Sequence, residues 1–263
     1  MSRLILHKML SEYRSHPTVQ YFLRFGTELE CVNNSIGKKL VIEATGTIFC
    51  LACSRKTSKS FHQGYCFPCM KKLARCDSCI IKPELCHFHK GTCREPEWGQ
   101  QHCMIPHLIY LANSSGIKVG ITRAHQAITR WIDQGAIQAI PIGLVKNRLE
   151  SGVIEVILKQ NFPDKTNWRT MLKGNIEFLD LSDARQEAID LLPIHPFVEV
   201  QASDPLTIDY PVLAYPKSIK SFNLDEQRKL EGTLLGIKGQ YLILDTGVIN
   251  LRSFGGYEVD WQV

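Results

Sequence analysis

CLACSRKTSKSFHQGYCFPC, residues 50–69, is the stretch that decides how this chain folds. It contains two Cys-x-x-Cys pairs, separated by twelve residues. A two-residue spacer allows both thiolates of a pair to face one ion, and two such pairs complete a tetrahedral site. We therefore predict a zinc-ribbon-like region with one structural zinc ion; an iron–sulfur cluster is the alternative that four thiolates also suit. The predicted ligands are Cys50, Cys53, Cys66 and Cys69.

More cysteines follow directly after this stretch. Nine of the ten cysteines lie between Cys50 and Cys103, a region that is poor in long periodic apolar segments. Such a region has too little apolar material for its own core and needs a metal to fold. We predict a second structural zinc site, with buried free thiols as the alternative for some of these cysteines. The predicted ligands are Cys76, Cys79, Cys86 and Cys93, with Cys103 or His89 as alternative ligands.

The composition is that of a globular protein of 263 residues, 44% hydrophobic and 22% charged. The sequence has neither a signal-peptide pattern nor an apolar run of 18 residues, so we expect a cytoplasmic protein without a membrane partner. In a reducing compartment, clustered cysteines more often hold metal than form disulfides.

Charge is distributed unevenly along the chain. Residues 1–175 carry 24 basic and 12 acidic side chains, whereas residues 176–263 carry 7 and 14. A basic front half suits nucleic acid, either DNA or RNA, as a partner, and an ordinary solvated surface is the alternative. The acidic end of the chain suits a protein partner.

Patterning predicts an α+β protein in four parts. Residues 1–49 form a β-rich segment, 50–104 the zinc-knuckle region, and 105–175 a small sheet with flanking helices. Residues 176–263 contain a helix from Ser182 to Leu192 and a β-rich C-terminal domain, expected to be a small barrel or sandwich. Strands in this last part are predicted at Phe197–Val200, Val212–Tyr215, Lys229–Ile237, Gln240–Leu244 and Val248–Leu251. The early strands within residues 17–49 can pair with this terminal sheet.

The third part begins with a predicted hairpin. Its strands are 108–112 and 117–121, joined by an Asn-Ser-Ser-Gly turn. A helix is expected over 124–133, and a third strand over 136–145, where Pro141 favours an edge position. Helical spacing of apolar residues predicts a second helix over 149–160.

The hairpin resembles the opening of the GIY-YIG endonuclease superfamily. Leu108-Ile109-Tyr110 matches the first motif, and Lys118-Val119-Gly120 matches the second in the form used by a phage-type branch. Val119 stands where most members have a tyrosine. The superfamily's later arginine, glutamate and asparagine match Arg130, Glu155 and Asn167 in order and spacing.

The resemblance implies a metal-dependent phosphodiesterase, an endonuclease acting on nucleic acid. Its implied catalytic residues are Tyr110, Arg130, Glu155 and Asn167, with Glu155 binding Mg²⁺ or Mn²⁺. Its implied nucleic-acid contacts are Lys118, Arg123, His125 and Arg169. The alternative is a non-catalytic, zinc-dependent nucleic-acid-binding protein on the same scaffold, and a thiol or iron–sulfur redox protein is a third hypothesis.

A second resemblance covers most of the chain. Runs such as Gly91-Thr92-Cys93-Arg94 and the segments 130–136 and 164–169 are similar to a bacterial domain family of unknown function. This resemblance implies only that the zinc knuckles and the hairpin core occur together as one unit.

Overall fold

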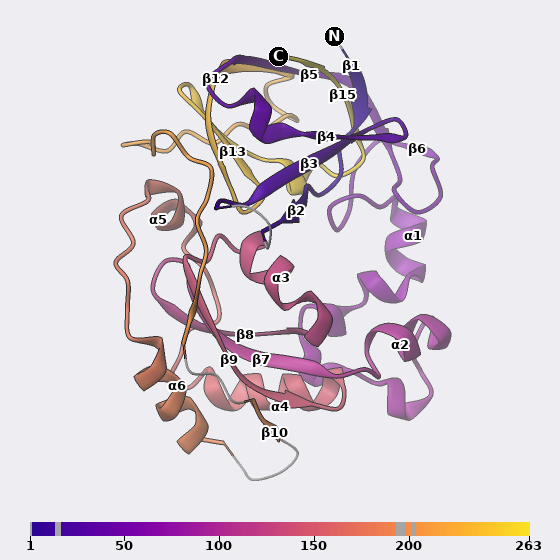
Figure 1. Cartoon of the computed structure of the whole chain (residues 1–263). Helices are drawn as coiled ribbons and strands as arrows, with labels where there is room; N and C mark the ends of the chain where they lie inside the picture. Colours follow the sequence, from indigo (N-terminus) through magenta and orange to yellow (C-terminus); the bar gives the residue numbers. More distant parts are fainter. Residues whose placement is uncertain (1, 14–16, 193–197, 201–203) are drawn as a thin grey trace. The chain divides into compact units, whose positions relative to one another are not determined.

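The computed structural model describes residues 2–13, 17–192, 198–200 and 204–263 (Figure 1). These residues form helices and three antiparallel sheets, so the predicted α+β class is confirmed. The chain divides into two compact units, each built from distant segments. The first contains Met1–Lys71, Leu172–Gly174 and Asp209–Val263, and the second contains Lys72–Met171 and Asn175–Ile208. None of the helices in the described ranges is both long and apolar enough to cross a membrane.

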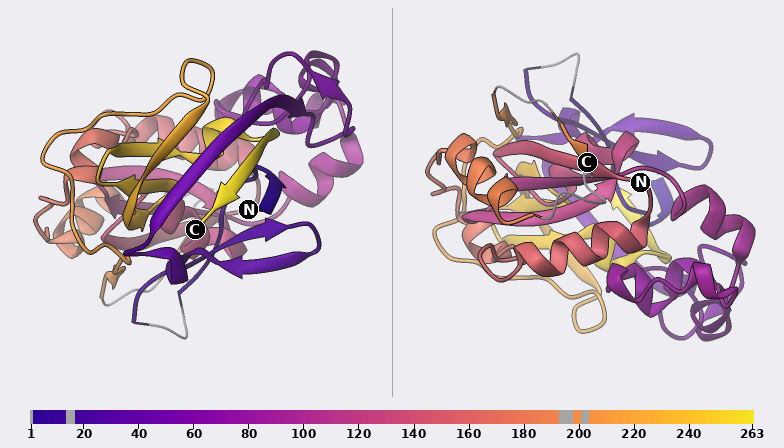
Figure 2. Two further views of the ribbon diagram at one scale, coloured as in Figure 1. Left: turned by 90° about the horizontal axis from the view of Figure 1, so that it is seen from above. Right: turned by 90° about the horizontal axis from the view of Figure 1, so that it is seen from below.

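The largest sheet belongs to the first unit. Its strands follow the order β1-β15-β5-β12-β13-β14, with β6 added beside β5. The long strand β5 runs between β12 and β15 (Figure 2). It alternates buried Leu40, Ile42 and Ala44 with more exposed residues, the period-2 pattern of a strand that covers a core. The bounds are β1 Ser2–Ile5, β5 Lys39–Phe49, β6 Lys56–Thr57, β12 Lys229–Lys238, β13 Tyr241–Leu244, β14 Gly247–Asn250 and β15 Tyr257–Gln262.

A second, three-stranded sheet of this unit consists of β2 (Leu10–Glu12), β3 (Gln20–Phe25) and β4 (Glu28–Cys31). The predicted pairing of early strands with the terminal sheet is confirmed for β5, whereas β3 pairs only with β2 and β4. The large sheet is open, because among the described residues β1 and β14 do not pair with each other. It therefore adopts no closed barrel.

The sheet of the second unit follows the order β10-β9-β7-β8, with β11 also beside β9. The predicted hairpin is confirmed: β7 and β8 are antiparallel, and Tyr110 lies opposite Gly120. Pro141 of β9 lies opposite Tyr110 on the other side, next to a register shift. The bounds are β7 His107–Asn113, β8 Ile117–Arg123, β9 Gln138–Val145, β10 Val198–Glu199 and β11 Leu206–Thr207; Phe197, predicted to begin a strand, lies outside the described residues.

Helices cover this sheet. α3 (Ala127–Asp133) and α4 (Arg148–Leu158) lie on opposite sides of it (Figure 1). Ile154 and Leu158 of α4 pack with Ile109 and Leu111 of β7, and α6 (Leu181–Asp190) completes the same core. Because neighbouring residues of a strand point to opposite faces, Tyr110 lies on the other face, where its ring contacts Trp131 of α3.

The remaining elements are short. α1 (Phe67–Lys72) follows the turn that carries Cys66, α5 (Trp168–Lys173) follows Asn167, and a 3₁₀ turn η6 (Ala124–Gln126) precedes α3. Residues 73–103 form four 3₁₀ turns and one helix: η2 Ala74–Cys76, η3 Ser78–Ile80, η4 Pro83–Leu85, η5 Phe88–Lys90 and α2 Pro96–His102. The first unit also contains η1 (Val32–Ser35) and η7 (Leu251–Phe254).

Candidate functional site

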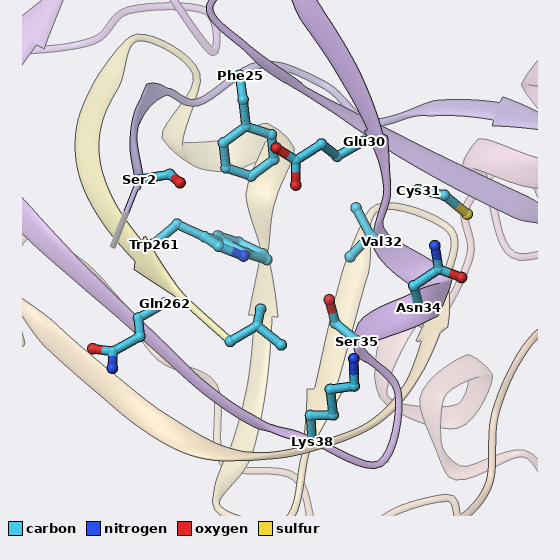
Figure 3. Close-up of a pocket in the computed structure, with 11 residues that line it drawn as sticks. Ser2, Phe25, Glu30, Cys31, Val32, Asn34, Ser35, Lys38, Trp261 and Gln262 are labelled. Atoms are coloured by element: carbon cyan, nitrogen blue, oxygen red, sulfur yellow. The ribbon is translucent and has the colours of Figure 1, made fainter.

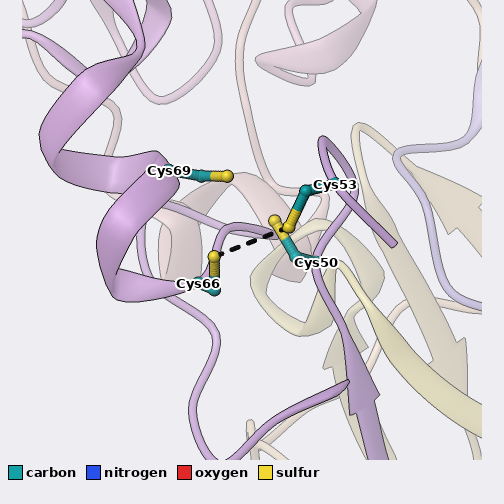
Figure 4. Close-up of side chains that lie close together, drawn as sticks. All are labelled: Cys50, Cys53, Cys66 and Cys69. Atoms are coloured by element: carbon teal, nitrogen blue, oxygen red, sulfur yellow. Dashed lines mark hydrogen bonds between the residues drawn. The ribbon is translucent and has the colours of Figure 1, made fainter. Parts of the chain in front are cut away.

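The two Cys-x-x-Cys pairs of the first unit come together at the end of β5 and the start of α1 (Figure 4). The first pair lies in a tight turn in which the Cys50 amide donates to the Arg55 carbonyl, and Ser54 takes a left-handed φ of 58°. The amide of Leu51 donates to the carbonyl of Gly64 at 2.7 Å, which joins this turn to the segment that carries the second pair.

The four thiols have the spacing of ligands around one ion. Their sulfur atoms all lie within 4.8 Å of one another, and the Sγ atoms of Cys53 and Cys66 are 3.8 Å apart. Zinc–sulfur bonds of about 2.3 Å in a tetrahedron place sulfur atoms about 3.8 Å apart. In a four-iron cluster each thiolate binds a different iron, which spreads the sulfurs farther. The arrangement is therefore consistent with a structural zinc site.

Hydrogen bonds and burial shift the pKa values of two of these thiols in opposite directions. Burial raises the pKa of Cys50, but amide donors from Cys66, Cys53 and Ala52 outweigh burial and lower that pKa to about 6. Burial and the neighbouring thiols raise the pKa of Cys69 to about 12. One thiolate is thus favoured and further thiolates are opposed, as expected for a site that needs a positive ion to ionise completely.

The other clustered cysteines belong to the second unit. Cys79, Cys86 and Cys103 are buried together, with Phe88, Trp98 and Leu149 packed against them. These three cysteines line a small cavity, and Cys93 lines it as well. The two remaining ligand candidates are a buried Cys76 and an exposed His89, and neither lines that cavity. Burial raises the pKa of both Cys79 and Cys103 to about 11.

Tyr110 is held in the interior of the second unit. Its side chain is 0% exposed, and its hydroxyl donates to the Gln134 side-chain oxygen at 3.0 Å. Burial raises the pKa of Tyr110, while the charge and hydrogen bond of Arg130 oppose that rise. The ring covers Gly120, where an added Cβ would lie 2.6 Å from the Tyr110 oxygen, so only glycine fits across from the tyrosine.

Two further ionisable side chains of the second unit are buried. Lys118 is 3% exposed, and its ammonium donates to the Thr166 hydroxyl at 2.7 Å. Burial, helped by the charge of Arg130, lowers the pKa of Lys118 to about 7. Glu155, 9% exposed, has a pKa raised by burial although Lys159 lies 3.3 Å away. Glu155 interacts electrostatically with Tyr110 and Lys118, although its helix α4 covers the opposite face of the sheet from Tyr110. We refer to Tyr110, Arg130, Lys118 and Glu155 as the Tyr110 cluster.

The other predicted site residues lie nearer the surface of this unit. Asn167 is exposed, and its side-chain oxygen accepts from the amides of Arg169 and Thr170, so it caps α5. The exposed Arg169 guanidinium lies 4.3 Å from the ring centre of Trp168. Arg123 is half-buried at the end of β8, and His125 is exposed in η6. Catalytic and nucleic-acid-binding roles for these residues stay predictions.

The first unit also has a pocket of about 560 Å³ on its surface (Figure 3). Phe25 and Trp261 meet edge to face at 6.1 Å in its wall, between the three-stranded sheet and β15. None of the predicted site residues lines it.

Comparison with known proteins places the chain in a family. Residues 37–259 match the family described as a protein of unknown function, DUF2797. The chain belongs to the DUF2797 family. The match spans both the first cysteine cluster and the Tyr110 cluster, as expected from the resemblance over most of the chain. No curated protein and no solved structure matches the chain.

Several residues that shape these sites in this DUF2797 member were not predicted. Gln134 holds the Tyr110 hydroxyl, and Thr166 holds the Lys118 ammonium. Both contacts join residues far apart in sequence, so no local sequence pattern predicts them. Lys159 pairs with Glu155 and with Asp164 at 3.1 Å. The four-residue spacing of Glu155 and Lys159 on a predicted helix was a usable signal for this pair.

Proposed function

We propose that this protein is a metal-dependent phosphodiesterase that acts on nucleic acid through the Tyr110 cluster. The observation that carries the proposal is the burial of Lys118 and Glu155 in the same unit as Tyr110 and Arg130, with shifted pKa values for both the amine and the carboxyl group. Buried ionisable groups are costly, and proteins concentrate them where they perform chemistry.

The hairpin supports the same proposal through its resemblance to the GIY-YIG superfamily. Tyr110 and Gly120, the ends of the two short motifs, lie directly opposite each other on antiparallel strands. Arg130 lies on the next helix, and Glu155 on the helix after the third strand. Lys118, from the second motif, lies on the same face as Tyr110, because cross-strand partners and alternate residues share a face.

In this proposal Glu155 would hold a hard divalent cation. Glu155 interacts electrostatically with the carboxylates of Asp164 and Glu84, and carboxylate oxygens are the ligands that Mg²⁺ and Mn²⁺ prefer. Bound there, the ion would polarise a phosphoryl oxygen. Lys159, which now neutralises Glu155 and Asp164, would have to release at least one of them.

The chain's own side chains have distinct tasks in this proposal. Arg130 would grip a phosphate oxygen, because a guanidinium offers parallel donors to such an oxyanion. Lys118 would add positive charge beside it. Hydrolysis forms a bond between a water oxygen and phosphorus and breaks the bond to the leaving sugar oxygen, which takes up a proton. Tyr110, whose hydroxyl donates to Gln134, would contact the attacking water.

A non-catalytic nucleic-acid-binding protein is the second candidate function. The complete burial of Tyr110 and the capping role of Asn167 favour it, since both residues then have structural tasks. The zinc-bearing first unit and the basic residues before position 176 would bind the phosphate backbone, and the acidic C-terminal part would bind a protein.

A cleavage assay separates the two functions. Purified protein with Mg²⁺ or Mn²⁺ is expected to nick branched, duplex or single-stranded nucleic acid, and Glu155→Ala is expected to abolish nicking. Glu187→Ala, an exposed glutamate of α6, is the matched control and should cut like the wild type. Circular dichroism shows whether each variant is folded.

Equal nicking by the wild type and Glu155→Ala would refute the phosphodiesterase. Binding without nicking, weakening steeply as salt rises, would favour the second candidate because phosphate contacts release counterions. Absence of any binding at low salt would refute both.

A further inference from the structure

Residues 73–103 of the second unit fold with almost no apolar core. Their longest element is the seven-residue helix α2, and the rest are three-residue turns. The buried cluster at their centre consists of three cysteines, Cys79, Cys86 and Cys103. A segment that buries thiols instead of large apolar side chains gains too little from burial to order itself and needs a cross-link or a metal.

Four cysteines line one small cavity in this segment. Cys79 lies in η3, Cys86 directly follows η4, and Cys103 directly follows α2. Cys93 comes two residues after Gly91, whose left-handed φ of 69° turns the chain back. All four line a cavity of about 10 Å³. A cavity that holds one water needs a volume of this order, so the space suits one small sphere.

The packing around the cavity depends on Gly99, which has no side chain. A Cβ at Gly99 of α2 would lie 3.0 Å from the Cys93 sulfur and 2.8 Å from the Phe88 ring. Glycine in a helix interior costs about 1 kcal/mol relative to alanine. Its presence here lets α2 approach Cys93 closely and brings Cys103, at the end of α2, to the other three thiols.

We propose that Cys79, Cys86, Cys93 and Cys103 bind a second structural zinc ion. This ligand set differs from the predicted one, because Cys103 replaces Cys76. Residues 72–104 are all described, and Cys76, which lies in η2, is not among those that line the cavity. The site stands on its own observations and does not depend on the phosphodiesterase.

A competing set of ligands lies close by. Possible donor atoms of Asp77, Cys79 and His87 come within 4.8 Å of one another, whereas the four proposed sulfurs do not all come that close and would have to move together around a bound ion. Asp77, however, is already engaged: its carboxylate lies 2.7 Å from Arg94 and accepts from the Ser78 hydroxyl at 3.2 Å. Four thiolates complete a tetrahedral zinc site without breaking that ion pair. Asp77 and His87 would then line the cavity without binding the ion.

The second zinc centre also fixes the start of helix α4. Arg148, the first residue of α4, donates through its side chain to the carbonyls of Cys79 and Ile80 at 3.1 and 2.6 Å. Its amide donates to the carbonyl of Cys103 at 2.8 Å. Two of the four proposed ligands are therefore tied through their backbones to the helix that carries Glu155.

Metal content tests this site directly. Wild-type protein, purified without chelator, should contain two zinc ions per chain. Cys103→Ser should contain one, and Cys76→Ser, the matched control, should keep two. Cys103→Ser should also speed amide exchange at the start of α4, while amides of β5 in the other unit stay protected. One zinc in the wild type, or two in Cys103→Ser, would overturn the proposal, as would loss of an ion from Cys76→Ser.

X-ray absorption at the zinc edge tests the wild type itself and so does not depend on whether variants fold. The expected spectrum shows four sulfur neighbours per zinc at about 2.3 Å. Nitrogen or oxygen neighbours at about 2.0–2.1 Å would assign the second ion to Asp77 and His87 and refute the four-thiolate centre. Intramolecular disulfides among these four cysteines in freshly purified protein would refute it too.

Discussion

Substitution of Gly152 by alanine should destabilise the second unit, against the usual trend for helices. Gly152 lies within α4, where glycine normally costs about 1 kcal/mol relative to alanine, so Gly152→Ala would ordinarily stabilise. Here the α4 helix packs against η4 at this point. An added Cβ would overlap the backbone nitrogen of Glu84 and the carbonyl carbon of Pro83, and would lie 2.8 Å from the Glu84 Cα.

The magnitude follows from the kind of atom that the new methyl group meets. Overpacking a core typically costs about 1–3 kcal/mol. Backbone atoms cannot rotate away as the end of a side chain can, so the cost lies near the upper end of this range. After subtracting the gain in helix propensity, we expect Gly152→Ala to lower the free energy of unfolding by about 2 kcal/mol.

Thermal unfolding followed by circular dichroism measures this effect. For a chain of this size a loss of 1 kcal/mol lowers Tm by about 2–4 °C, so Gly152→Ala should unfold about 4–8 °C below the wild type. Val153→Ala, at the neighbouring exposed position of the same helix, is the control and should change stability by less than about 0.5 kcal/mol. A Gly152→Ala protein as stable as the wild type would show that η4 does not press on α4.

Two further predictions concern single side chains of the second unit. Burial lowers the pKa of His107 to about 4, below its ordinary value, so the unfolded chain alone takes up this proton between about pH 6.5 and pH 4. Stability should therefore fall by about 3 kcal/mol as the pH drops through that window, and chemical denaturation of His107→Asn should lack this part of the slope. Asn167→Ala should cost about 1 kcal/mol through the lost cap of α5, whereas Asn167→Asp should keep wild-type stability. If Asn167→Asp is stable but does not nick, Asn167 has a task beyond the cap.

Local patterns predicted much of the fold because they act within a few residues. The hairpin of β7 and β8 follows from two short apolar segments around a turn, and α4 from its helical apolar spacing. The strands β12, β13 and β14 were found in the same way. In contrast, β1 and β15, which pair with each other across the whole chain, were not predicted as strands.

The edge position that Pro141 predicted for its strand is wrong. Proline cannot donate to a ladder, so an edge strand was predicted. β9 is not at the edge: β10 pairs with Gly143 and Leu144, and β11 with Gln138 and Ala139. Pro141 falls in the gap between these two short strands, and its carbonyl accepts instead from the Arg185 side chain at 2.9 Å.

The cysteines show the same division between local and distant information. A two-residue spacer announces each pair of the first cluster, and the sequence therefore predicted its four members together. In the second unit Cys76-x-x-Cys79 has the same spacer, yet Cys76 does not line the cavity that Cys79 shares with Cys86, Cys93 and Cys103. Helix α2 and Gly99 bring Cys103 into that group. The spacing of cysteines along the chain cannot predict such packing.

Anomalous X-ray scattering from a crystal of the wild-type protein, recorded on both sides of the zinc edge, shows whether the first cysteine cluster holds zinc. We predict a zinc peak between Cys50, Cys53, Cys66 and Cys69, about 2.3 Å from each of the four sulfurs. A structure in which these thiols form disulfides, or surround no anomalous peak, would contradict it.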